Sequence, residues 1–147
     1  MTEITGKVIH GDGYGKTLGF PTANLDRRQY VREKIKVRLG VWAGWAAFGP
    51  AAYSLKSIDY RLKAAIVIGP IDKLGLPKIE THLLNFSGNL YGKKVTITLK
   101  KYIRPFKKYK NVNDLKKQIQ KDVEKIKKLN LKYGPEHGAQ LAIKYAK

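Results

Sequence analysis

Residues 11–24 hold groups that suit a metal-bound phosphate. Four glycines fall within nine residues, and Lys16 lies among them: Gly11, Gly13, Gly15 and Gly19. Glycine lets a backbone approach a ligand closely, and successive exposed N–H groups can then form an anion-binding concavity. Lys16 adds a point charge suited to phosphate. Thr22 and Asn24 are neutral oxygen donors two residues apart, so an extended segment directs both to one side, and oxygen is the ligand that Mg²⁺ prefers.

A carboxylate and an imidazole lie two residues apart further along the chain. Glu80 and His82 fall within the segment 79–84, which is otherwise mostly apolar. On a strand the two side chains share one face, and such a pair suits proton transfer. For the pair taken alone, an edge strand with a polar outer face is the preferred interpretation.

The glycine-rich segment has two simpler interpretations, a Walker A loop and a hairpin turn. Gly15-Lys16-Thr17 matches the end of a Walker A loop, but that motif requires a glycine where His10 stands and a helix that begins at the lysine. Pro21 follows within five residues and disfavours helix at the residue before it. A glycine-rich hairpin turn explains the glycines alone, but the Pro-Thr-Ala-Asn sequence that follows them favours a binding site.

The elements that must position these groups are short strands followed by one late helix. Strand-like runs occur at 4–10, 41–48, 64–68, 79–84 and 94–102. The polar segment 25–40 connects strands, with one helical turn at most, and 69–78 is expected to be a loop. Asn111 with Asp114 resembles a capping box. An apolar stripe then predicts an amphipathic helix docked on the core: Leu115, Ile119, Val123 and Ile126.

This order of elements favours an antiparallel sheet closed as a barrel with a helix packed on it, and composition alone allows an OB-fold equally well. Gly44 inside the strand 41–48 predicts a bend or the close approach of a ligand. Trp42 and Trp45 have opposite parity on that strand, so both can line one pocket only if a bulge intervenes. The length of 147 residues predicts one domain over 1–147.

The charge is strongly positive and uneven. Thirty Lys and Arg against eleven Asp and Glu give a net charge of +19, and residues 93–132 hold fifteen of the basic groups. Such a surface suits nucleic acid or another polyanion. Lysine outnumbers arginine by twenty-four to six, whereas base readout and bidentate phosphate contacts favour arginine. Nucleic-acid binding is therefore not favoured as the main role, and a solvated lysine-rich face that attracts ATP is the simpler interpretation.

Several classes of protein are excluded or disfavoured by composition. The chain has no cysteine, which excludes a disulfide framework, a thiolate metal site and a cysteine nucleophile. No apolar run approaches the roughly 20 residues of a membrane span, and the N-terminus lacks the pattern of a signal peptide. We therefore expect a cytoplasmic protein without a membrane partner, and a monomer.

The order of motifs resembles the riboflavin kinases of the bacterial and eukaryotic type over about residues 4–129, with 130–147 as a tail outside the resemblance. The first motif is Gly-x-Gly-x-Gly-Lys-x-Leu-Gly-Phe-Pro-Thr-Ala-Asn at 11–24. The others follow in order: Gly-Val-Trp-Ala-Gly-Trp at 40–45, Ile-Glu-Thr-His-Leu-Leu-Asn-Phe at 79–86, Leu-Tyr-Gly at 90–92, Tyr-Ile-Arg-Pro at 102–105, and a Leu-x-x-x-Ile-x-x-Asp-Val helix at 115–123.

This resemblance implies a six-stranded antiparallel Greek-key barrel with a C-terminal amphipathic helix. It implies transfer of the γ-phosphoryl group of ATP to the ribityl 5′-hydroxyl of riboflavin, giving FMN, with Glu80 as the catalytic carboxylate. Thr22 and Asn24 would hold Mg²⁺, with Zn²⁺ or Mn²⁺ as alternatives, and the loop with Lys16 would wrap the phosphates. The remaining residues implied to contact nucleotide or flavin are Gly11, Gly13, Gly15, Leu83, Asn85, Tyr91, Arg104 and Tyr109.

Two departures from the family pattern affect the flavin side. Phe106 stands where the family commonly has an acid after Arg-Pro, and Val67-Ile68-Gly69-Pro70-Ile71 replaces a usual Asn-Ile-Gly-x-x-Pro-Thr segment. No adenylyltransferase domain precedes the kinase-like segment, so FAD synthesis is not expected from this chain. Two alternatives stay open: a basic β-barrel that binds RNA or DNA electrostatically, and a flavin-binding descendant without turnover.

Overall fold

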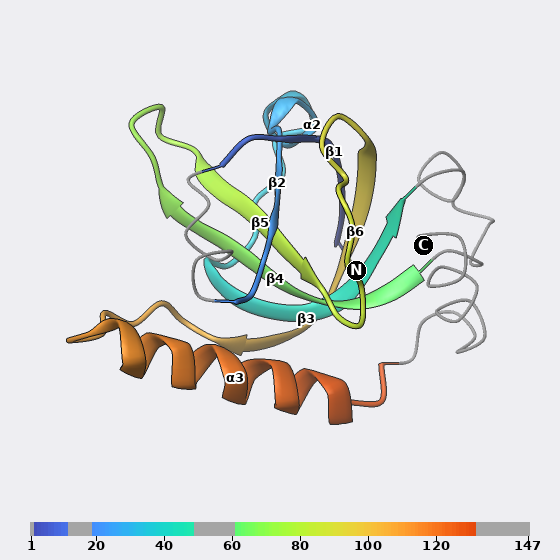
Figure 1. Cartoon of the computed structure of the whole chain (residues 1–147). Helices are drawn as coiled ribbons and strands as arrows, with labels where there is room; N and C mark the ends of the chain where they lie inside the picture. The colour runs from blue at the N-terminus through green and yellow to red at the C-terminus, as the bar shows by residue number, and fades with distance from the viewer. Residues whose placement is uncertain (1, 12–18, 49–60, 132–147) are drawn as a thin grey trace.

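Six antiparallel strands close into a barrel, and one long helix lies against its outer surface (Figure 1). The structure is a computed structural model that describes residues 2–11, 19–48 and 61–131. The strands are β1 (Thr2–Ile9), β2 (Ala23–Leu25), β3 (Gly40–Phe48), β4 (Arg61–Ile71), β5 (Pro77–Leu83) and β6 (Lys94–Arg104), and the helices are α2 (Arg28–Arg32) and α3 (Val112–Lys128).

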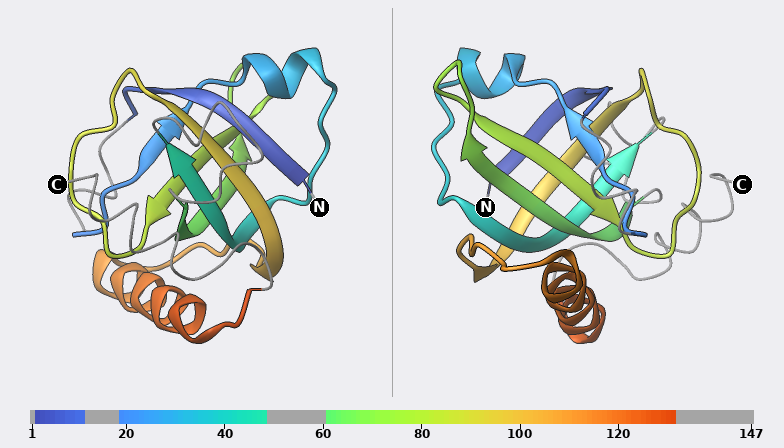
Figure 2. Two further views of the ribbon diagram at one scale, coloured as in Figure 1. Left: turned by 90° about the vertical axis from the view of Figure 1, so that its right-hand side faces the viewer. Right: turned by 60° about the vertical axis from the view of Figure 1, so that its left-hand side comes forward.

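The strand order around the barrel is β1-β2-β5-β4-β3-β6. Strands β3, β4 and β5 form consecutive antiparallel pairs, and β6 returns to pair with β3. This arrangement is a Greek key. The predicted six-stranded antiparallel barrel with a C-terminal helix is therefore confirmed, and both views in Figure 2 show α3 on one side of it.

Strict alternation along β5 separates the core from the outer face. Ile79, Thr81 and Leu83 are buried, whereas Glu80 and His82, between them, are only partly buried. Because successive side chains on a strand point to opposite faces, the two polar residues face outward. The predicted strand is correct, but it is not an edge strand, because β5 lies between β2 and β4 in the closed barrel.

Strand β3 bends where it crosses β6. The pairing shifts register between Val41 and Trp42 and again between Ala43 and Gly44. A Cβ at Gly44 would overlap the carbonyl oxygen of Thr98 on the neighbouring strand. The close approach that was predicted at this glycine is therefore made by β6.

The two tryptophans of β3 lie apart from the pockets described below. Trp42 packs against the barrel core, and Trp45 is buried outside that cluster. Neither side chain lines either pocket.

The β4–β5 hairpin is longer than predicted. Strand β4 continues past Gly69 to Ile71, which pairs with Pro77 after a register shift, so the loop shrinks to residues 72–76. Asp72 stabilises this turn, because its carboxylate accepts hydrogen bonds from the backbone N–H groups of Leu74 and Leu76 at 2.9 and 3.3 Å.

Helix α3 is fixed to the outside of the barrel along its length. The side chain of Asn111 accepts a hydrogen bond from the N–H of Asp114, which confirms the predicted cap. Val123 and Ile126 are buried in a second apolar cluster with Ala43, Ala65 and Leu84 of the barrel. Lys63 of β4 donates from Nζ to the carbonyl oxygens of Lys127 and Leu129 at 3.1 and 2.5 Å, and so satisfies the C-terminal end of the helix.

No helix within the described ranges is both long and apolar enough to cross a bilayer. The C-terminal segment after Leu131 lies outside the described residues.

Candidate functional site

Two pockets meet at Thr22, which lines both of them. The first has a volume of about 620 Å³ and is formed by the end of β1, the segment 21–24, β5 and the turn 86–91. The second, of about 410 Å³, lies between the outer face of the barrel and α3. Both volumes fall within the range of about 300–1,000 Å³ that small-molecule sites occupy. The site can therefore hold two ligands side by side.

The register of β2 against β5 brings the predicted site residues together. Asn24 is paired directly with Glu80, and directly opposed residues on antiparallel strands have Cβ atoms about 5 Å apart. Both face outward, because their neighbours Leu25 and Thr81 are buried in the barrel. Asn24 lines the first pocket and Glu80 lines the second, so the carboxylate stands beside the boundary between them.

His82 binds the backbone of the segment that carries Thr22. Its Nδ1 lies 2.7 Å from the carbonyl oxygen of Pro21, and because a carbonyl can only accept, Nδ1 carries the proton. The hydrogen bond joins β5 to the start of the Pro-Thr-Ala-Asn segment. In the predicted Glu80–His82 pair, Nδ1 of His82 is therefore occupied by a hydrogen bond to the segment that carries Thr22.

The first pocket combines a close backbone approach with an aromatic pair. A Cβ at Gly11 would overlap the side chain of Asn24, so only glycine lets these two pack together. The rings of His10 and Tyr91 stack with centroids 3.9 Å apart and an interplanar angle of 25°. The fully buried Thr81 hydroxyl, also in the lining, has no hydrogen-bond partner within the part of the chain that the structure describes.

The second pocket is mostly apolar and is lined by several aromatic rings. Phe20, Phe106 and Tyr109 contribute rings, and Val67 contributes an aliphatic wall. Gly69 has φ +107°, and a Cβ there would lie 2.7 Å from the Phe106 ring. The two departures from the family pattern therefore contact each other, since the ring of Phe106 packs directly on the glycine of the altered segment.

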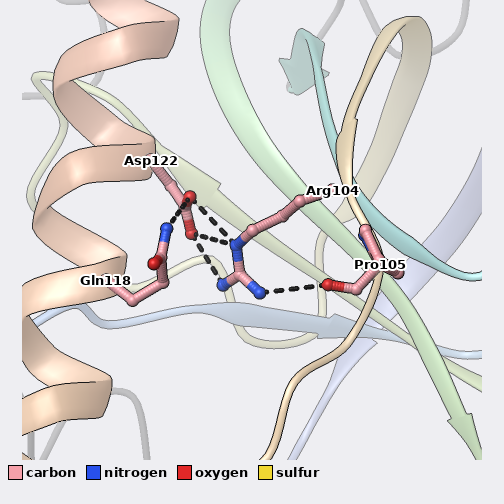
Figure 3. Close-up of polar contacts among 4 residues, drawn as sticks. All are labelled: Arg104, Pro105, Gln118 and Asp122. Atoms are coloured by element: carbon pink, nitrogen blue, oxygen red, sulfur yellow. Dashed lines mark hydrogen bonds and ion pairs between the residues drawn. The ribbon is translucent and has the colours of Figure 1, made fainter.

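Arg104 joins the second pocket to α3 (Figure 3). Its Nε donates to both carboxylate oxygens of Asp122 at 3.0 Å, and its Nη2 donates to Oδ2 at 2.8 Å. Gln118, one turn earlier on the helix, donates to the same carboxylate at 3.0 Å. Burial disfavours the charged guanidinium, but the hydrogen bonds and the charge of Asp122 outweigh this effect and raise the pKa of Arg104 above its ordinary value.

The structure brings together most of the predicted site residues that it describes. Gly11, Thr22, Asn24, Leu83 and Tyr91 line the first pocket, and Glu80, Arg104 and Tyr109 line the second. Asn85 is the exception: it is exposed in the turn after β5, with φ +58°, and lines neither pocket. Gly13, Gly15 and Lys16 lie outside the described residues.

Sequence reasoning missed Asp122 and Gln118 as site residues. The signal was present, because Asp122 lies three residues after Ile119 and four before Ile126, on the same face as the apolar stripe. An acid at a core-facing position needs a buried partner, and Arg104 is that partner.

The side chains near the pockets decide whether the site can hold a divalent ion. No group of three or more His, Cys, Asp or Glu side chains that could hold a metal occurs within residues 2–11, 19–48 and 61–131. Thr22 and Asn24 instead offer neutral oxygens at the boundary of the two pockets. Neutral oxygens with few carboxylates suit Mg²⁺ that takes its other ligands from phosphate and water, so these residues fit such an ion.

The closed barrel with two adjoining pockets places this chain among the β-barrel proteins with a small-molecule site. Comparison with known families identifies the family. The model of the family described as "Flavokinase: Riboflavin kinase" matches residues 1–130. The chain therefore belongs to the riboflavin kinase family.

Individual relatives agree with this assignment. The chain is 35% identical over 133 residues to the bifunctional riboflavin kinase/FMN adenylyltransferase of Haemophilus influenzae, covering 85% of this chain and 37% of that protein. It is 32% identical to the riboflavin kinase of Mus musculus, covering 90% and 81% of the two chains. The crystal structure of riboflavin kinase from Trypanosoma brucei superposes with a TM-score of 0.62 at 25% identity, over 85% and 76% of the two chains. The chain spans little more than a third of the bifunctional bacterial relative.

Proposed function

We propose that this chain transfers the γ-phosphoryl group of ATP to the ribityl 5′-hydroxyl of riboflavin and releases FMN. The observation that carries the proposal is the meeting of the two pockets at Thr22, with Glu80 directly opposite Asn24. Family membership supplies the substrates, and the pockets supply two places for them. Phosphoryl transfer depends mainly on positioning and charge neutralisation, and adjoining pockets provide the first of these.

The nucleotide belongs in the first pocket in this proposal. Its phosphates would lie at the glycine-rich segment that begins at Gly11, and its base would reach the stacked rings of His10 and Tyr91. The buried hydroxyl of Thr81 is a hydrogen-bonding group that a polar edge of the base would satisfy. Thr22 and Asn24 would hold Mg²⁺, which neutralises charge on the phosphates when it is bound.

The flavin belongs in the second pocket. The isoalloxazine ring would pack between the aromatic wall of Phe106 and Tyr109 and the outer face of the barrel. Arg104 would face its polar edge, because Asp122 and Gln118 fix the guanidinium in the pocket lining. The ribityl chain would then run toward Thr22, where Glu80 accepts or orients the proton of the 5′-hydroxyl. A loose transition state demands little proton transfer, so orienting the hydroxyl is the larger part of this role.

The direct test is FMN formation from riboflavin and ATP, run in parallel with Mg²⁺, Mn²⁺ and Zn²⁺. We expect turnover by the unmodified chain, and a loss in kcat for Glu80→Ala at the lower end of the roughly 10²–10⁴-fold range for a general base, because a loose transition state demands little proton transfer. Asn24→Ala should mainly raise the metal concentration that is needed for the half-maximal rate. Glu33→Ala is the matched control, because Glu33 is an exposed carboxylate after α2 that lines neither pocket.

Two outcomes would count against the proposal. Folded protein that binds riboflavin but forms no FMN with any of the three metals would support the flavin-binding alternative instead. Equal activity of Glu80→Ala and Glu33→Ala would remove the assigned role of the carboxylate.

A further inference from the structure

The outer face of α3 carries a row of lysines that point away from the barrel. Lys117, Lys121, Lys125 and Lys128 are exposed and spaced by four, four and three residues. At 100° and 1.5 Å per residue, they fall within about 80° of the helix circumference and extend over about 16 Å. The buried residues Val123 and Ile126 lie on the opposite side, so the packing of α3 fixes the direction of the row. We call these four residues the lysine row.

The lysine row makes no close ion pair. Among the residues that the structure describes, no carboxylate lies within 4 Å of any of its four ammonium groups; of the two exposed acids of this helix, Asp114 lies in the first turn and Glu124 lies 3.9 Å from Lys127. Like charges at i,i+4 disfavour a helix, so the arrangement opposes folding rather than supporting it. The attraction of lysine for the helix C-terminus explains Lys125 and Lys128 but not Lys117 and Lys121, which lie in the first ten residues of the helix.

The surroundings of the lysine row favour a phosphate backbone over a lipid surface. A helix that lies in a membrane interface inserts an apolar face, whereas the apolar face of α3 is already packed on the barrel (Figure 1). The one large hydrophobic residue of α3 that is strongly exposed in the described structure is Val112, at the first position of the helix. Lysine carries charge without the bidentate geometry that reads base edges, so any binding would depend on phosphate and not on sequence.

We propose that the lysine row binds the phosphate backbone of nucleic acid without sequence preference. The segment before the helix adds two exposed ammonium groups at its N-terminal end, those of Lys108 and Lys110, whereas Lys107 lines the second pocket. A strand bound along the outer face leaves the second pocket open, because that pocket is lined by the inner face of the helix through Leu115 and Ile119. Nucleic-acid binding and the chemistry of the pockets are therefore compatible on this fold, and neither proposal depends on the other.

The test uses a double variant whose helix content is checked. Lys121→Glu with Lys128→Glu brings the four side chains of the row to a net charge of zero and replaces like-charge neighbours within the row by opposite ones at i,i+4 and i,i+3. The new carboxylates lie one turn from Glu124, and one of them lies in the last turn of the helix. The matched control is Lys7→Glu with Lys34→Glu, which makes the same change in charge on β1 and after α2, away from α3 (Figure 1). The probe is a fluorescein-labelled 20-nucleotide oligo(U), followed by fluorescence anisotropy between 50 and 200 mM NaCl, with circular dichroism as the check on folding.

We expect micromolar binding of oligo(U) by the unmodified chain, with log affinity falling linearly with log salt concentration. The α3 variant should reduce the magnitude of that slope by about two, because each lost phosphate contact changes it by about one. Its affinity near 100 mM NaCl should fall more than tenfold, and the control should lose much less.

Three results would overturn the proposal. Equal losses in the two variants would mean that the net charge of +19 acts as a whole, with no localised surface. Binding to vesicles of anionic lipid at concentrations that leave oligo(U) unbound would assign the row to a membrane. The absence of any oligo(U) binding at 50 mM NaCl would exclude nucleic-acid binding by the lysine row.

Discussion

Replacing Asp122 by asparagine tests whether α3 positions Arg104 for the ligand of the second pocket. The carboxylate accepts three hydrogen bonds from the guanidinium at 2.8–3.0 Å and one from Gln118 at 3.0 Å. Asparagine keeps the shape of the side chain and one oxygen acceptor, but it removes the charge. Because the amide nitrogen cannot accept a hydrogen bond, Arg104 loses part of its fixation without a change in volume.

The expected loss of stability follows from the burial of the ion pair between Asp122 and Arg104. The side chain of Asp122 is 7% exposed and that of Arg104 is 20% exposed, so solvent screens this pair much less than a surface pair. A hydrogen bond to a charged group contributes about 1.5–3 kcal/mol. With one acceptor retained, we expect Asp122→Asn to lower the free energy of unfolding by about 2 kcal/mol, which corresponds to a fall in Tm of about 4–8 °C at this chain length.

The KM values for riboflavin and for ATP separate a role of Asp122 in positioning Arg104 from a role in stability alone. If Arg104 contacts the flavin, Asp122→Asn should raise the KM for riboflavin by about 10- to 100-fold, since each factor of ten corresponds to about 1.4 kcal/mol. The KM for ATP should stay within about twofold, because neither residue lines the first pocket. Asp114→Asn, the same substitution at the exposed N-terminal turn of α3, should change neither value. A variant that is destabilised while both KM values stay unchanged would refute the reasoning and leave the ion pair with a structural role only.

The remaining predictions concern the two sides of the β4–β5 hairpin. Gly69→Ala should weaken riboflavin binding and stability more than Gly75→Ala, because only the first adds a contact 2.7 Å from Phe106 while both positions have positive φ; equal thermal shifts and riboflavin affinities would contradict this. The hydrogen bond from Arg27 lowers the pKa of Asp72 below its ordinary value, so its stabilisation is present above the unfolded pKa of about 3.9 and is lost as pH falls through the folded pKa. Asp72→Asn should therefore lower the urea midpoint at pH 7, and its difference from the unmodified chain should shrink below about pH 4; a constant difference from pH 7 to pH 3 would argue against the linkage.

Local patterns predicted the parts of the fold that have local causes. The alternation at 79–84 correctly indicated a strand with Glu80 and His82 on one face. Asn111 with Asp114 correctly indicated the start of α3. Thr22 and Asn24 both line the first pocket, as do the residues next to them, and the register of β2 on β5 places Asn24 opposite Glu80.

Contacts between distant segments explain what the sequence did not reveal. The close approach at Gly44 is made by a carbonyl of β6, more than fifty residues away. The extension of β4 to Ile71 depends on its pairing with Pro77 across a register shift. The face of α3 on which Asp122 lies follows from the local pattern, but its partner Arg104 follows only from the docking of the helix on the barrel. Each of these features depends on which segments are neighbours in the folded chain.

The central claim is that two ligands meet at Thr22 beside Glu80, and a crystal structure of the ternary complex tests it most directly. The chain would be crystallised with riboflavin, Mg²⁺ and a non-hydrolysable ATP analogue. We predict that the ribityl 5′-oxygen lies about 3–3.5 Å from the γ-phosphorus, as in a near-attack geometry, with Glu80 within hydrogen-bonding distance of that oxygen. Riboflavin bound with its 5′-hydroxyl directed away from Thr22, or the two ligands competing for one pocket, would contradict the account.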